Sequence, residues 1–106
     1  MTKKKITFLG KEVTIAYNMA TQIAYEEISG AAFEPEALHK TSNTMILYFA
    51  CIIANNPETT ITFDNLLMDA IAADIKLLGE TVMESFHDWC KTVMEEAPKE
   101  DDGKNA

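Results

Sequence analysis

The sequence predicts an α+β domain that is mainly α-helical, with an N-terminal β-hairpin followed by four or so helices, the last of them long. Three observations lead to this class. Two short segments rich in β-branched and aromatic residues flank Gly10. Apolar residues then recur at spacings of three and four through most of the chain. The last such stripe reaches about Glu96, which predicts a helix well beyond the usual three turns.

Segments 6–9 and 13–17 alternate apolar with polar or small residues, so each strand has one face to bury. The pair Gly10-Lys11 lies between them, and a Gly-X pair favours a tight hairpin with a type II′ turn. An isolated hairpin is only marginally stable in water. We therefore expect this one to pack on helices or to pair with another strand, including that of a second copy in a homo-oligomer.

Asn18 is a good N-cap for a first helix, because its side chain can accept a hydrogen bond from a free backbone N–H of the first turn. Gly30 ends this helix, since glycine adopts the left-handed conformation at low cost. The face predicted to be buried is an apolar stripe at helical spacing. Its members are Ala20, Ile23, Ala24 and Ile28.

The sequence predicts two further helices in the middle of the chain. Pro35 suits the first turn of a short helix through Lys40. The next helix begins near Ser42 or Asn43 and carries residues 45–54, which are apolar nearly all round. We therefore place this helix at the centre of the domain.

Thr62 is the N-cap of a short amphipathic segment, and a final helix runs from about residue 73 to 96. Gly79 weakens that helix by about 1 kcal/mol relative to Ala, and predicts a break, a kink or a close helix–helix approach. The apolar positions of the short segment are Phe63, Leu66, Leu67, Ala70 and Ile71. Those of the final helix are Ile75, Leu78, Val82, Phe86, Trp89, Val93 and Met94.

Length and charge exclude several classes of protein. The 106 residues fit one domain, which we place at residues 1–97, with a disordered acidic tail at 98–106. Nine lysines, no arginine and 17 acidic residues give a net charge of −8, which argues against nucleic-acid binding and against an anionic membrane surface. The longest apolar run is too short for a bilayer, which needs about 20 residues. Two cysteines make no disulfide framework, so we expect a cytoplasmic protein.

No side-chain set predicts catalysis. His39, Cys51, His87 and Cys90 match a zinc set in number, but the chain has neither a CxxC nor an HxxxH pair. His87 and Cys90 lie three apart on one helix and lack an orienting third group. We interpret Cys51 as a core thiol and the two imidazoles as surface groups. The sequence therefore predicts no catalytic residue, no metal site and no cofactor.

Three stretches of the chain, in order, resemble one known family. Residues 15–30 lead from a strand ending in an aromatic residue and Asn, through a helix, to Glu-Glu-Ile-Ser-Gly, and Phe33 follows. An apolar helix then ends in Asn56-Pro57, and a Thr-led helix start precedes Asp64. The third stretch is the long C-terminal amphipathic helix with its charged tail. Together they cover about residues 5–96 and resemble the tail assembly chaperones of long-tailed bacteriophages and prophages.

The resemblance implies a non-enzymatic protein without a cofactor. It implies binding to the tape-measure protein, which this family keeps soluble during tail assembly, and, in a longer frameshifted product, to the tail-tube protein. It also implies a location in the host cytoplasm and absence from the mature virion. The alternative is a small phage structural or oligomerisation module, such as a tail or head–tail connector component.

A chaperone that binds an aggregation-prone client needs exposed apolar surface, together with charge that keeps the complex soluble. The net charge of −8 supplies the second requirement. For the first, our hypothesis is a partner-binding surface on the final helix. It consists of Met83, Phe86, Trp89 and Met94. The alternative is that these side chains face the core of the domain, because methionine and aromatic residues at helical spacing more often fill a core.

Overall fold

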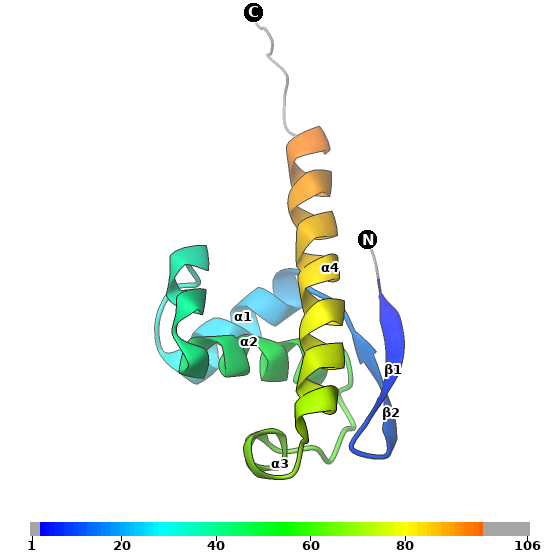
Figure 1. The fold of residues 1–106 in the computed structure, drawn as a ribbon. Helices are drawn as coiled ribbons and strands as arrows, with labels where there is room; N and C mark the ends of the chain where they lie inside the picture. The colour runs from blue at the N-terminus through cyan, green and yellow to red at the C-terminus, as the bar shows by residue number, and fades with distance from the viewer. Residues whose placement is uncertain (1–2, 97–106) are drawn as a thin grey trace, which may run out of the picture.

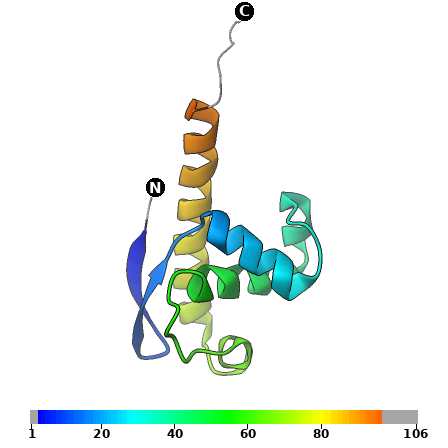
Figure 2. The same ribbon diagram turned by 180° about the vertical axis from the view of Figure 1, so that it is seen from behind.

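The structure is a computed structural model that describes residues 3–96, and it confirms the mainly helical α+β class. The elements in chain order are β1 (Lys4–Phe8), β2 (Lys11–Ile15), α1 (Met19–Ser29), the 3-10 helix η1 (Pro35–His39), α2 (Thr41–Ile53), α3 (Phe63–Met68) and α4 (Ala72–Glu96). In Figures 1 and 2 the hairpin lies on one side of α4, and α1, η1 and α2 lie on the other. The tail predicted at residues 98–106 lies outside the described residues.

The hairpin is confirmed, but its predicted turn is wrong. The antiparallel register pairs Phe8 with Lys11, so the turn residues are Leu9 and Gly10 rather than Gly10 and Lys11. Both have positive φ, 54° and 76°, which is the pattern of a type I′ turn. Such a turn matches the right-handed twist of the strands, and Leu9 takes the left-handed conformation that glycine usually supplies.

Helix α1 has the predicted caps but buries a different face. The Asn18 side chain accepts from the Thr21 N–H, and Gly30 has a φ of 76°. The buried residues are Thr21 and Tyr25, whereas Ile23 is 50% exposed. The helix is therefore rotated by roughly one residue, about 100°, from the predicted orientation. The buried hydroxyl of Thr21 explains this, because it donates to the Ala16 carbonyl at 2.8 Å and so fixes which side faces inward.

Helix α2 occupies the centre of the core, as predicted. Its buried residues are Leu47, Ala50, Cys51 and Ile52. Tyr17, at the end of the hairpin, extends this core towards α4. Its ring makes edge-on contacts with Phe86 and Trp89, at centroid distances of 4.9 and 5.9 Å. Its backbone N–H donates to the Ser85 hydroxyl at 2.8 Å, which fixes the hairpin on α4.

Two asparagines at the end of α2 join it to the hairpin. The Asn55 amide donates to the carbonyls of Ala16 and Cys51, at 2.8 and 2.7 Å. The Asn56 amide donates to the Thr14 carbonyl at 2.7 Å and accepts from the Thr14 N–H at 2.9 Å. The sequence predicts only that these residues end a helix. In the structure they also satisfy backbone groups of the strand and of the loop after it.

Helix α4 is continuous, so of the three possibilities at Gly79 the close approach is the one observed. A Cβ atom at Gly79 would lie 2.6 Å from the hydroxyl oxygen of Tyr48 on α2. Glycine leaves room here for the Tyr48 ring, which would have to shift to admit a Cβ atom.

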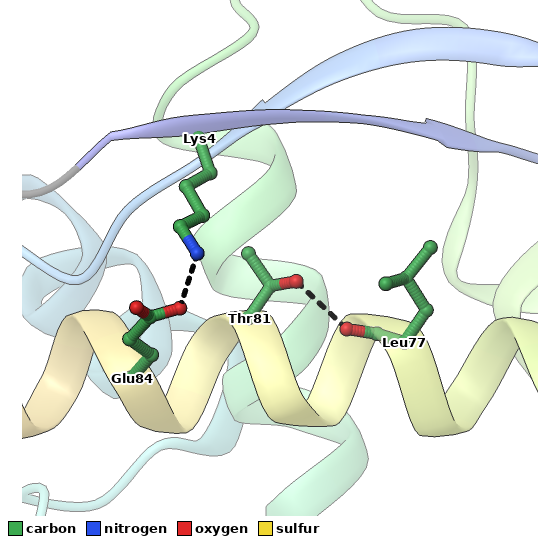
Figure 3. A network of polar contacts seen from close by, with 4 residues as sticks. All are labelled: Lys4, Leu77, Thr81 and Glu84. Atoms are coloured by element: carbon green, nitrogen blue, oxygen red, sulfur yellow. Dashed lines mark hydrogen bonds and ion pairs between the residues drawn. The ribbon is translucent and has the colours of Figure 1, made fainter.

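The exposed side of α4 also contacts the hairpin. The Lys4 ammonium of β1 lies 2.5 Å from a carboxylate oxygen of Glu84. Figure 3 shows this ion pair beside the hydrogen bond that Thr81 donates to the Leu77 carbonyl one turn back. Glu84 therefore has a cationic partner within its own chain, although such an exposed pair contributes little to stability. Within residues 3–96, no helix combines the length and apolar character that a membrane span requires.

Candidate protein-binding surface

The four residues predicted to bind a partner do not share one environment. Met83 is 44% exposed. Phe86 and Trp89 are partly buried and pack on the core through Tyr17. Trp89 lies about 120° around the helix axis from Met83. Met94 lies in the last turn of α4, whose side chains fall outside those described. Of the three described side chains, Met83 alone is left open to a partner.

A more exposed apolar group lies where α3 turns into α4. Leu67, Met68 and Ile71 are 47%, 79% and 65% exposed, and we call these three residues the corner patch. Leu66 is buried and Ala70 packs against the core, so the chain alternates between inward and outward apolar side chains. The amphipathic pattern of this segment predicts that Leu67 and Ile71 face the core, which is wrong. One side of the short helix α3 faces the core, so Leu66 is buried while its neighbours Leu67 and Met68 are exposed.

The corner patch is held by hydrogen bonds rather than exposed by fraying. At the start of α3, the Thr62 hydroxyl accepts from the Asn65 N–H, and the side-chain amide oxygen of Asn65 accepts from the Thr62 N–H. The Asn65 amide also donates to Asp69 at 2.9 Å. The Ile71 N–H donates to Asp74 at 3.1 Å, where α4 begins. The backbone around all three apolar residues is therefore fixed in the folded chain.

Apolar contacts beneath the corner hold it against the domain. Leu66 is 1% exposed, and Phe63 contacts Phe49 of α2 with ring centroids 5.4 Å apart. Burial of a leucine and an aromatic ring of this kind contributes about 1.5–3 kcal/mol per side chain. The patch is thus part of the folded surface of the domain.

The surroundings of the corner patch are acidic. Residues 63–77 contain three aspartates, Asp64, Asp69 and Asp74, and one lysine, Lys76. Asp64 and Asp69 are exposed, and Asp74 is half-buried. The patch is therefore an apolar surface with a local excess of negative charge, on a chain whose net charge is −8.

Helix α1 carries a second exposed apolar group, which we call the α1 stripe. Met19, Ile23 and Ile28 are all exposed because Thr21 and Tyr25 occupy the buried side. The three side chains spread over more than two helical turns. They are therefore less concentrated than the three of the corner patch.

The cysteines and histidines lie in the environments predicted for them. Cys51 is buried, and burial raises the pKa of its thiol to about 12. His39 and His87 are exposed, and Cys90 is half-buried on α4. Across residues 3–96, no group of three or more His, Cys, Asp or Glu side chains is placed to hold a metal ion.

Two open depressions lie beside the hairpin. One, of about 430 Å³, is formed by the start of β2 and residues 55–60. The other, of about 390 Å³, lies between Leu9 and Asp69 and shares Lys11 and Thr60 with the first. Neither is lined by His87 or Cys90, so neither places these two side chains in a cleft.

Comparison with known proteins places the chain in no family. No protein-family model matches it, and no curated protein and no solved structure is detectably similar to it. The surface of the domain and the sequence resemblance are therefore the features that bear on function.

Proposed function

We propose that the protein is a non-enzymatic tail assembly chaperone of a long-tailed phage or prophage. It binds the tape-measure protein in the host cytoplasm and keeps it soluble while the tail assembles. The observation that carries this proposal is the corner patch, three large apolar side chains held open on a folded acidic domain.

The surface suits this role for two physical reasons. Exposed apolar side chains can cover apolar segments of a client that would otherwise associate with one another. Net charge on the chaperone then keeps the complex soluble through repulsion between complexes. The chain combines the two features, since residues such as Met68 and Ile71 are exposed on a domain of net charge −8. A soluble complex between the chain and its client is the expected product.

Co-purification tests the proposal. The tagged chain and the tape-measure polypeptide of the same phage or prophage are co-expressed, and tagged complexes are recovered from the soluble fraction. The proposal expects the tape-measure polypeptide in these complexes. Its absence from them, while it accumulates in the pellet at the same level as without the chain, would contradict the proposal.

The alternative is a small structural or oligomerisation module of the tail or head–tail connector. One observation favours it: among residues 3–96, β1 has a strand on one side only, so its outer edge is free to pair. Mass spectrometry of purified virions separates the two functions. A structural module stays in the particle at fixed stoichiometry, and an assembly chaperone does not.

A further inference from the structure

We propose that the corner patch is the docking surface for a client helix whose apolar stripe is flanked by lysine or arginine. This inference rests on the proposed function and gives it a place on the molecule and a partner chemistry. The patch consists of Leu67, Met68 and Ile71, three exposed apolar residues of the α3–α4 corner.

The shape of the corner suits an amphipathic helix. Such helices bind through apolar residues at positions i, i+3, i+4 and i+7, which together form a narrow stripe. The three side chains of the patch lie within five consecutive residues and so present a compact target. Because hydrogen bonds to Asp69 and Asp74 already hold the corner, its backbone needs no ordering when a partner binds.

The charge around the patch selects the partner. Asp64 and Asp69 are exposed beside it, and Asp74 lies at the start of α4. Cationic side chains at the edge of the bound helix would therefore meet carboxylates, which favours association and discriminates against acidic partners. Two lysines lie in this region, Lys76 on α4 and Lys11, which lines the same depression as Asp69, and they leave the balance negative.

The same charges argue against a second copy of this chain as the occupant. Two corners placed face to face would bring together two sets of Asp64, Asp69 and Asp74. Each copy also carries a net charge of −8, so their approach is repulsive at physiological salt. A cationic amphipathic segment meets no such barrier.

Three synthetic peptides test the proposal with the full chain at about 0.15 M ionic strength. The first has a leucine stripe with lysine elsewhere, the second has the same stripe with glutamate, and the third has the lysines but serine in place of leucine. Binding is measured by fluorescence anisotropy of labelled peptide. The leucine–lysine peptide is expected to bind at least about tenfold more tightly than either of the others.

Two double variants locate the site. Met68→Ser with Ile71→Ser removes the patch, and Met19→Ser with Ile23→Ser is the matched control on the α1 stripe. The first pair of substitutions is expected to weaken binding of the leucine–lysine peptide at least about tenfold. The second pair is expected to leave the affinity for this peptide within about twofold of wild type. Circular dichroism confirms that both variants fold, and both should, since all four residues are exposed.

Three results would overturn the inference: equal affinity for the lysine and glutamate peptides, unchanged affinity of the corner variant, or a wild-type dimer in sedimentation that the corner variant loses. Failure here is distinguishable from failure of the proposed function. If the corner variant still co-purifies with the tape-measure polypeptide, the function stands and the surface is wrong. If the peptides bind as expected but the tape-measure polypeptide does not, the surface stands and the function is wrong.

Discussion

The side-chain amide of Asn56 takes the place of a neighbouring β-strand for Thr14. Its oxygen accepts from the Thr14 N–H at 2.9 Å, and its nitrogen donates to the Thr14 carbonyl at 2.7 Å. The nitrogen also donates to the Ile52 carbonyl at the end of α2. One side chain therefore satisfies the outward backbone groups of Thr14 on β2 and joins the hairpin to the central helix. The two-stranded sheet leaves the outer edge of β1 without a strand among the described residues.

Replacing Asn56 should destabilise the domain clearly. Asn56→Ala removes three hydrogen bonds and leaves the partly buried groups of Thr14 without partners, so we expect a loss of about 2 kcal/mol in the free energy of unfolding. Asn43→Ala is the matched control, because that amide makes a single recorded bond, to the Ala37 carbonyl. It should cost about 1 kcal/mol or less. Urea denaturation measures both, and equal losses in the two variants would contradict the role given to Asn56.

A methyl group at Gly79 should stabilise the domain less than alanine's better helix propensity predicts. Its Cβ would lie 2.6 Å from the Tyr48 hydroxyl oxygen and 3.2 Å from the Cζ atom. We expect the strain of moving the Tyr48 ring to cancel most of the propensity gain of about 1 kcal/mol in Gly79→Ala. Tyr48→Phe removes the nearer contact and should recover part of this gain in the double variant. Additive effects in thermal denaturation would show that the two residues do not meet.

Alkaline pH should weaken the fold through Tyr17. Burial raises the pKa of its phenol to about 12 from 10.0, with smaller contributions from Cys51, Cys90 and Glu26. The folded state therefore favours the protonated phenol, so this contribution to stability is complete below pH 10 and is lost as the pH rises towards 12. Denaturant midpoints measured between pH 9 and 12 should fall. In Tyr17→Phe the fall should be shallower, and an identical pH profile in that variant would contradict the assignment.

The two thiols should differ in reactivity. Cys51 is buried with its pKa raised to about 12, so its thiolate is scarce and shielded in the folded chain. Cys90 is half-buried on α4 and open to reagents. A thiol-specific reagent at pH 8 should label one cysteine quickly, and the second only after denaturant is added. Peptide mapping that finds Cys51 labelled first would contradict the burial described here.

The sequence predicts local structure well where a single residue decides it. The structure confirms the N-caps Asn18 and Thr62 and the end of α1 at Gly30. It also confirms the central position of α2, which carries Cys51. Each depends on a local backbone requirement or on a run of apolar residues, so a short window of sequence contains the information.

The sequence predicts poorly which side of a short helix faces inward. On α1, apolar residues occur on both sides, and the hydrogen bond from Thr21 to the Ala16 carbonyl decides between them. On α3, the consecutive residues Leu66 and Leu67 cannot both be buried, and the contact between Phe63 and Phe49 sets the orientation. These are tertiary contacts, so periodicity alone does not contain them. The corner patch was missed for the same reason.

The most direct test of the account is the solubility of the tape-measure polypeptide when it is co-expressed with variants of the chain. Wild type and Met19→Ser/Ile23→Ser are expected to keep most of it in the supernatant, and Met68→Ser/Ile71→Ser is expected to leave it in the pellet. Solubility that is unaffected by any form of the chain, including its complete omission, would contradict the claim that this domain acts by covering apolar segments of another polypeptide.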